Sequence, residues 1–246
     1  MKEQNLKKRI HLHIERIYST SLNETEILEF SDNIYNLIVS KKTLHASSLL
    51  SDQWSEKTTV LITYANSITN TNNMSPLSSL QKFVSSKCQQ FIDTVHILPF
   101  FPSSSDDGFA VKDYYNIDNE FGDWKDIINI SKSFRVMADV VINHGSSEGV
   151  WFKNFIKGEG RGHDYFLSFD NTFDITEVVR PRTSPLLNTF DTHDGTRYLW
   201  CTFSKDQVDY NFNNPKVINE FVEIILYYLK MGITIFRFDA VAFLWK

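Results

Sequence analysis

Four short apolar runs follow residue 57, and helical periodicity precedes the last three of them. The runs are rich in β-branched residues and lie at 58–65, 93–100, 134–141 and 232–239. Helices are expected at about 76–91, at about 122–132 and directly before the fourth run. Short apolar strands that alternate with helices are typical of βα units and a parallel sheet. The pattern therefore predicts an α/β fold.

The helix before the fourth run carries the clearest boundary signals. Asn214 has a side chain that caps helix N-termini, and Pro215 suits the first helical position. Gly232 ends the pattern. Between these signals apolar residues recur at helical spacing, namely Val217, Ile218, Phe221, Ile224, Ile225, Tyr228 and Leu229. This stripe predicts an amphipathic helix with one face against the core.

Two further segments depart from the alternation of strand and helix. Residues 1–57 have helical periodicity, with a second helix at 24–40 that Ser21 and Glu24 precede at capping-box spacing. Residues 145–212 are irregular and rich in Gly, Asn, Asp, Ser and Pro. A structureless stretch of this length is more often functional than filler, so we expect an inserted subdomain there. The predicted organisation is a helical N-terminal extension (1–57), strands one to three with their helices (58–144), the insertion (145–212), and a last helix and strand (213–246).

Charge and hydropathy narrow the classes of partner. The formal net charge is −5 and the sequence holds no block of Lys or Arg, which argues against nucleic acid. The first residues, MKEQNLKKRIHLHIERIY, lack the apolar centre of a signal peptide. No apolar run reaches the roughly 18 residues that a membrane helix needs. We therefore expect a cytoplasmic protein without a membrane partner.

Polar groups follow each of the last three predicted strands. These endings read PFFPSSSDDGFAVKDYYNID, DVVINHGSSEG and FRFDA. Ligands of parallel α/β folds bind at the carboxyl ends of the strands, so the three endings are expected to converge on one site. In the fourth strand, Arg237 and Asp239 are two residues apart and therefore point to the same face. A guanidinium beside a carboxylate keeps it ionised, and an ionised carboxylate in a pocket can attack an anomeric carbon. The alternative is a structural ion pair that takes no part in chemistry.

Two of these endings carry a family resemblance. DVVINH (139–144) resembles the first motif of the α-amylase family of glycoside hydrolases, and GITIFRFDA (232–240) resembles the second, which bears the nucleophile. The flanking stretches VHILPFFPSSSDDGFAVKDYYNID, EFGDW, RPR, LWCTFSKDQVDYN and DAVAFLWK are similar to the sucrose phosphorylase subfamily. The helical extension, SSDDGF and WFKNF are more similar to its glucosylglycerate phosphorylase branch, beside the sucrose phosphate phosphorylases. The resemblance implies the N-terminal half, strands 1–4, of a (β/α)8 TIM barrel. A helical N-terminal extension precedes it, and the inserted subdomain follows strand 3.

The resemblance also implies roles for individual residues. Asp239 matches the nucleophile that forms a glucosyl ester, whereas Asp139 is expected to be a buried structural acceptor. Asp106 and His144 match the pair that grips the glucosyl hydroxyls, and Phe109 matches an aromatic residue beside them. Arg237 matches the substrate-site arginine that supports the nucleophile. Phe203 and Gln207 match positions on the acceptor side. Arg182 matches a residue of the phosphate-binding loop, and Arg180 is a weaker candidate for the same loop.

The implied activity is that of a retaining α-glucosyl phosphorylase, which acts on an α-glucoside and inorganic phosphate. No organic cofactor and no metal are implied. The family's acid/base glutamate follows strand five, and here no acidic residue follows Asp239. We therefore expect this chain alone to lack normal turnover. A separate C-terminal half chain or self-association would complete it, and the alternative is a truncation, a frameshift or an incomplete assembly.

Two alternatives remain open at this stage. One is half of an α-glucosidase or transglucosidase of the same clan, and the other is a non-catalytic sugar-binding remnant. The acceptor is also open, because fructose, fructose phosphate and glycerate are all compatible with these residues.

Overall fold

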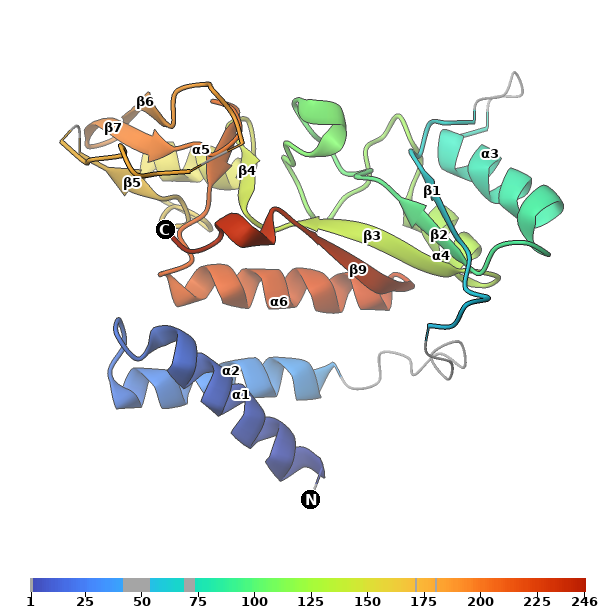
Figure 1. Cartoon of the computed structure of the whole chain (residues 1–246), viewed down its shortest axis with the longest axis horizontal. Helices are drawn as coiled ribbons and strands as arrows, with labels where there is room; N and C mark the ends of the chain where they lie inside the picture. The colour runs from blue at the N-terminus through green and yellow to red at the C-terminus, as the bar shows by residue number, and fades with distance from the viewer. Residues whose placement is uncertain (1, 42–53, 69–73, 171, 180) are drawn as a thin grey trace.

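The computed structural model describes residues 2–41, 54–68, 74–170, 172–179 and 181–246. Its centre is a parallel sheet in the order β1-β2-β3-β9 (Figure 1). The strands are β1 (Val60–Thr63), β2 (Thr94–Ile97), β3 (Arg135–Val141) and β9 (Ile233–Asp239). All four coincide with the predicted apolar runs. Neither β1 nor β9 has a second neighbour among the described strands, so the sheet is open and no closed barrel forms.

Helices α4 (Trp124–Ser131) and α6 (Pro215–Lys230) both begin at capping residues, and the cap of α6 is the predicted one. Helix α4 begins after Asp123, whose side chain forms a capping box with Asp126. Helix α6 begins after Asn214, whose side chain accepts from the amide of Lys216. Helix α3 (Pro76–Phe83) is shorter than predicted, because the chain continues from Val84 to Cys88 as a π-helical turn.

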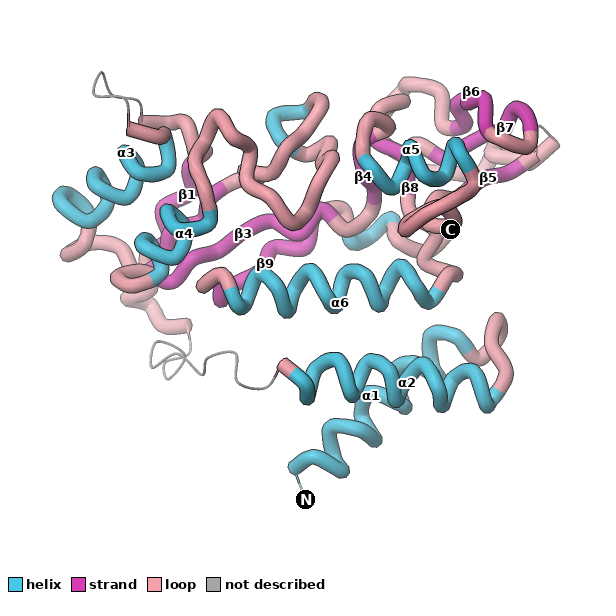
Figure 2. The backbone as a smooth tube through the Cα atoms, turned by 180° about the vertical axis from the view of Figure 1, so that it is seen from behind, coloured by secondary structure: helices cyan, strands magenta, loops and turns pink. Residues whose placement is uncertain are grey.

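Helix α6 covers the sheet along β3 and β9, as the two opposite views show (Figures 1 and 2). Its predicted apolar stripe is buried at Val217, Phe221, Ile224 and Tyr228. Successive strand side chains point to opposite faces, so the same strands also present a second face. That second face is partly uncovered, since Ile62 of β1 is 61% exposed.

Two N-terminal helices, α1 (Lys2–Tyr18) and α2 (Glu24–Ser40), pair with each other and lie against α6 (Figure 1). The predicted capping box at Ser21 and Glu24 is wrong by two residues. Asn23 caps α2 instead and Glu26 completes the box, because the cap must directly precede the first helical residue. Tyr18 is fully buried, and its hydroxyl donates to the Phe212 carbonyl at 2.7 Å. None of the described helices is long and apolar enough to cross a membrane.

Residues 145–212, predicted to be irregular, contain regular elements that local patterns did not indicate. They are β4 (His144–Ser146), α5 (Val150–Lys157), β5 (Ser168–Phe169), β6 (Leu187–Thr192), β7 (Gly195–Trp200) and β8 (Gln207–Asp209). Strands β5, β7 and β6 form one antiparallel sheet, and β4 pairs antiparallel with β8. The β4–β8 pair sets His144 opposite Asp209, so the two ends of this region meet.

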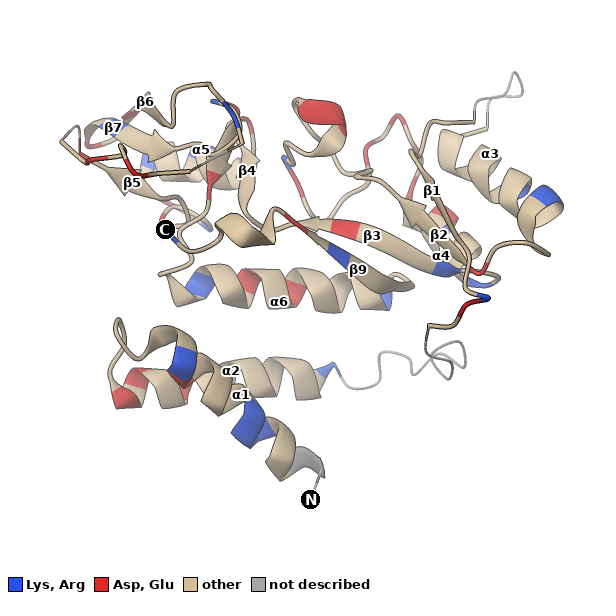
Figure 3. Cartoon of the chain, viewed as in Figure 1, with Lys and Arg blue, Asp and Glu red and all other residues tan. Residues whose placement is uncertain are grey.

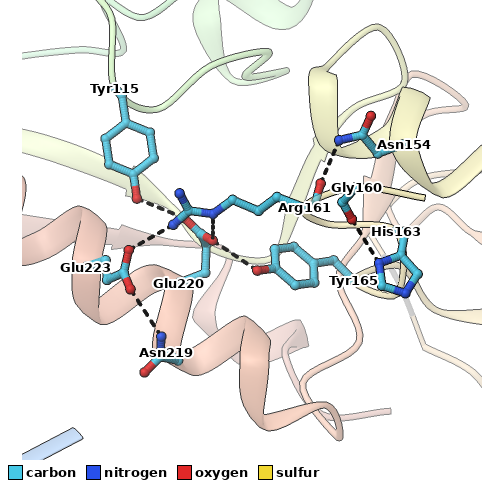
Figure 4. Close-up of polar contacts among 9 residues, drawn as sticks. All are labelled: Tyr115, Asn154, Gly160, Arg161, His163, Tyr165, Asn219, Glu220 and Glu223. Atoms are coloured by element: carbon cyan, nitrogen blue, oxygen red, sulfur yellow. Dashed lines mark hydrogen bonds and ion pairs between the residues drawn. The ribbon is translucent and has the colours of Figure 1, made fainter. Parts of the chain in front are cut away.

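A buried carboxylate joins this region to α6 (Figure 4). Glu220 is 2% exposed and accepts from Arg161 Nε at 2.7 Å, from Tyr115 at 2.8 Å and from Tyr165 at 2.9 Å. A second carboxylate of the cluster, that of Glu223, accepts from Arg161 at 2.8 Å. The cluster borders a cleft of about 440 Å³ between α2 and α6, and its charged groups pair with one another.

Glu220→Ala is expected to lower the free energy of unfolding by about 2–3 kcal/mol, because two tyrosine hydroxyls and a guanidinium lose their acceptor. Denaturant unfolding measures this. Glu223→Ala is the matched control, since it removes the exposed partner of the same guanidinium and is expected to cost about 0.5 kcal/mol. Equal losses of unfolding free energy in the two variants would contradict the interpretation that Glu220 is the carboxylate that joins this region to α6.

Candidate active site

The predicted nucleophile, Asp239, is the last residue of β9 and lies opposite Val141 of β3. Its Oδ1 is 3.0 Å from Arg237 NH1, so the two side chains share a face as the spacing predicted. Asp239 has a side chain that is 17% exposed. Ala240 then adopts a left-handed conformation with a φ of 56°, which turns the chain away from the strand. The Asp239 carboxyl group is thus held beside a guanidinium at the carboxyl edge of the sheet.

Arg237 also binds a second carboxylate, that of Asp139 in β3. Asp139 is fully buried and accepts from His96 Nε2 at 2.8 Å on its other oxygen. In Figure 3 an acidic position on β3 lies beside a basic position on β9. Burial opposes the charge of Arg237, but Asp139 and Asp239 outweigh it and raise the pKa of Arg237. Asp139 therefore serves as the buried acceptor that fixes the guanidinium beside Asp239.

The loop after β2 reaches this edge through a strained turn. Asp106 and Asp107 have positive φ values of 56° and 50°, a conformation that disfavours most side chains by roughly 1–2 kcal/mol per residue. Gly108 has a φ of 101°, and a Cβ there would lie 2.7 Å from the Pro99 carbonyl oxygen, so only glycine fits. The turn aims the Asp106 carboxylate at Gln207 Nε2, which donates to it at 2.8 Å.

His144 and Gln207 come together because β4 pairs with β8. His144 Nε2 lies 3.2 Å from Gln207 Nε2 and 3.2 Å from the Phe109 carbonyl oxygen. The Phe203 ring lies 5.0 Å from the imidazole. Burial lowers the pKa of His144, although Asp209, Asp239, the Phe109 carbonyl and Asp106 act in the opposite direction. The imidazole is therefore neutral at pH 7.

Six of the residues predicted from the sequence thus surround one edge of the sheet beside Asp239, namely Asp106, Phe109, His144, Phe203, Gln207 and Arg237. The Arg237 guanidinium lies 5.9 Å from the centre of the Phe109 ring. A cleft of about 390 Å³ opens beside the strained turn, and residues that line it include Tyr64, Pro99 and Asp107. None of the described residues that line it is Asp239 or one of these six, so the cleft lies beside the cluster rather than within it.

Arg182, one of the two predicted phosphate-binding arginines, is not part of this cluster. Arg182 is exposed and forms no hydrogen bond or ion pair with the rest of the described chain. Arg180 lies outside the described residues.

Sequence reasoning missed Asp206, which organises the loop around the strained turn. Its carboxylate accepts from the hydroxyls of Ser104, Ser105, Ser146 and Ser147. These serines come from the loop after β2 and from the beginning of the 145–212 region. Burial opposes ionisation, but the four hydroxyls lower the pKa of Asp206. The only signal in the sequence was the serine-rich SSSDD next to a predicted strand end.

Asp206→Asn is expected to lower the free energy of unfolding by about 1–2 kcal/mol at pH 7, because hydrogen bonds to a charged acceptor are lost. The pKa of Asp206 is lower in the folded chain than the unfolded value of about 3.9. Its stabilisation is therefore fully present above about pH 4 and disappears as the pH falls through the folded pKa.

Urea unfolding at several pH values measures the difference between the variant and the unaltered chain, which should shrink in acid. Asp170→Asn is the control, since Asp170 also accepts from a hydroxyl, that of Thr172, but is exposed and remote from the loop. A difference that stays constant down to pH 3 would refute the assigned role of the Asp206 charge.

The fold and this constellation can now be compared with known proteins. Residues 89–246 match the family model described as "Alpha amylase, catalytic domain". The match covers more than half of the chain, and the chain therefore belongs to the α-amylase catalytic-domain family.

Several proteins similar to this chain are glycoside phosphorylases. The glucosylglycerate phosphorylase of Escherichia coli is 36% identical over 98% of this chain and 42% of its own length. That of Allomeiothermus silvanus is 42% identical over 78% of this chain and 35% of its own length. The solved sucrose 6F-phosphate phosphorylase from Thermoanaerobacter thermosaccharolyticum is 29% identical, with a TM-score of 0.70 over 82% of this chain and 43% of that chain.

These findings confirm the predicted family and fold. The chain spans less than half the length of these relatives. Its four parallel strands correspond to the N-terminal half of a TIM barrel, with helices before them and the insertion after the third strand. A trehalulose synthase, 24% identical with a TM-score of 0.67, shares the fold.

Proposed function

We propose that this chain provides the glucosyl-binding and nucleophilic part of a retaining α-glucosyl phosphorylase. The observation that carries this proposal is the Asp239–Arg237 pair at the edge where Asp106, His144 and Gln207 converge. The names of its relatives, which are glycoside phosphorylases, support the same reaction. The whole enzyme would convert an α-glucoside and phosphate into α-glucose 1-phosphate and the free acceptor.

The reaction would proceed in two displacements. First, an Asp239 oxygen attacks the anomeric carbon, the bond to the acceptor oxygen breaks, and that oxygen takes a proton from an acid. Second, a phosphate oxygen attacks the same carbon and releases Asp239, so two inversions leave the α configuration. Arg237 would orient the Asp239 carboxylate for the first step through their 3.0 Å contact.

The glucosyl hydroxyls would be held by polar groups that already face one another. Asp106 offers acceptor oxygens and the neutral His144 offers an N–H donor, whereas Gln207 offers a donor next to them on the acceptor side. Hydrogen bonds of this kind strengthen as the sugar gains oxocarbenium character. Phe109 would lie beside the bound sugar, and Phe203 towards the acceptor.

Phosphate would be bound by Arg182, with Arg180 as a second candidate. The guanidinium is a planar fork of donors that matches a phosphate, and Arg182 is exposed and unpaired within the described chain. The acid/base carboxyl must lie about 5–5.5 Å from the nucleophile in a retaining enzyme. Asp106 is already paired with Gln207, so we propose that a further segment of polypeptide supplies this group. A separate C-terminal half chain would do so, whereas self-association would cover the open sheet edges.

The test is reconstitution with the C-terminal part of the barrel from a glucosylglycerate phosphorylase relative. The chain alone is expected to form no α-glucose 1-phosphate from glucosylglycerate, sucrose or sucrose phosphate, and the mixture is expected to form it from one of them. Free glucose as the only product in the presence of phosphate would favour a glucosidase or transglucosidase. Turnover by the chain alone would refute the proposed division of the site.

A mixture that forms a stable complex and binds glucose without any turnover would instead favour a non-catalytic sugar-binding protein. Glucose binding by the chain alone, followed by calorimetry, distinguishes this outcome from a complex that has failed to assemble.

A further inference from the structure

A buried charged network lies behind the proposed sugar site and has no role in the reaction described above. It consists of Asn143, Asp209 and Lys246. Lys246 Nζ lies 2.7 Å from Asp209 Oδ2 and donates to Asn143 Oδ1 at 3.1 Å. Asn143 Nδ2 donates to Asp209 Oδ2 at 2.9 Å. Asn143 and Asp209 are fully buried, and the Lys246 side chain is 9% exposed.

The two charges fix the orientation of the Asn143 amide. An ammonium group only donates hydrogen bonds and an ionised carboxylate only accepts them. Lys246 therefore requires the amide oxygen on its side, and Asp209 requires the amide nitrogen on the other. Exchanging the two ends of the amide would break both contacts at once. Thr202 holds Asp209 in place with two hydrogen bonds. Its backbone amide donates to Asp209 Oδ1 at 2.9 Å, and its hydroxyl donates to Asp209 Oδ2 at 2.6 Å.

The fixed amide in turn acts on His144, which follows it in the chain. Asn143 Nδ2 lies 3.3 Å from His144 Nδ1, and because it is a donor the ring nitrogen must accept. A neutral imidazole carries one proton, so that proton lies on Nε2. The Phe109 carbonyl oxygen, 3.2 Å from Nε2, requires the same assignment because it can only accept.

One contact opposes this assignment. Gln207 Nε2 also lies 3.2 Å from His144 Nε2, and it is a donor because its other partner is the Asp106 carboxylate. Two contacts thus favour the proton on Nε2, and one favours it on Nδ1. When the proton of His144 lies on Nε2, the N–H groups of His144 Nε2 and Gln207 Nε2 lie next to each other. This arrangement suits an acceptor oxygen placed between the two donors.

We infer that Lys246 and Asp209 are positioning residues that act through Asn143 to hold His144 in the tautomer with its proton on Nε2. The ring then offers a donor to the site together with Gln207. The use of this donor to bind a glucosyl hydroxyl rests on the proposed function. The tautomer itself does not, because every contact that sets it lies within the chain.

Nuclear magnetic resonance of the chain labelled with ¹⁵N-histidine tests the inference. Correlation of ring protons with both ring nitrogens at pH 7 distinguishes a protonated from an unprotonated nitrogen, and His144→Gln identifies the His144 signals. We expect a protonated Nε2 and an unprotonated Nδ1 in the unaltered chain. In Lys246→Met the amide loses one of its two constraints, so the two nitrogen resonances should move towards each other.

Lys216→Met is the matched control, because Lys216 is also ion-paired, with Asp164 at 2.6 Å, but is exposed and outside the network. If Lys246→Met does not fold, Asp209→Asn carries the same expectation, since it removes the constraint on the amide nitrogen. A proton on Nδ1 in the unaltered chain overturns the inference, and so does an unchanged pair of resonances in the folded variant. Added glucose should shift Nε2, and failure of this shift alone would count against the proposed function and leave the tautomer assignment intact.

Discussion

Asp239→Asn is expected to abolish phosphorolysis by the reconstituted enzyme, with a fall in rate of about 10⁴-fold or more, as for other residues that act as nucleophiles. The amide has nearly the shape of the carboxylate but lacks the charge that the proposed attack on the anomeric carbon requires. Arg237 would keep its contact with Asp139, so the fold at the sheet edge is retained. The initial rate of α-glucose 1-phosphate formation measures the effect.

Two further measurements make this prediction specific to the chemical step. Intact mass spectrometry of the unaltered protein after rapid quenching should show a glucosyl adduct, and the Asp239→Asn variant should show none. Asp191→Asn makes the same chemical change on the exposed surface of β6 and should retain full activity. A variant at Asp239 with more than about a tenth of the normal rate would show that the nucleophile is another residue.

Asp139→Ala is expected to cause the largest loss of stability, about 3–5 kcal/mol. The carboxylate is fully buried, and its removal leaves His96, which is 4% exposed, without its 2.8 Å partner. Arg237 would lose the same acceptor, although its 44% exposure allows water to replace part of that contact. Denaturant unfolding of the chain, with the slope of the transition compared between variants, gives the difference.

Asp93→Ala provides a control at the opposite end of the same strands. Asp93 is largely exposed at the surface and accepts from the Thr59 amide at 2.9 Å, so its loss is expected to cost about 1 kcal/mol. A loss of similar size in the two variants would mean that the Asp139 carboxylate does not join β2, β3 and β9 as described.

The parallel sheet could be predicted because its signals are local. Apolar runs and helix caps lie within a few residues of the elements that they define, and Arg237 and Asp239 share a face through the period of a strand. The strand ends converge in any parallel sheet, which is why Asp106 and His144 were found near Asp239. The N-cap of α2 is Asn23 and not the predicted Ser21. When several residues that can cap a helix lie close together, the sequence does not fix which of them begins the helix.

The features that the sequence did not predict depend on contacts between distant parts of the chain. Nothing near His144 indicates that it pairs with Asp209, 65 residues later, or that Lys246 reaches the same carboxylate. Asp206 looked like an ordinary loop residue, since its four serines come from two other segments. Arg182 was predicted from resemblance, and in this chain it stands apart from the cluster.

The antiparallel β4–β8 pair has a consequence for how such a protein can diversify. It joins the start and the end of the 145–212 region at the sheet edge, and His144 and Gln207 belong to the two paired strands. The entropy of closing a loop changes only slowly with its length, so insertions between the two strands are tolerated with little loss of stability. Evolution can therefore remodel the distal part of this region, and with it, under the proposed function, the selection of an acceptor, while His144 and Gln207 keep their places.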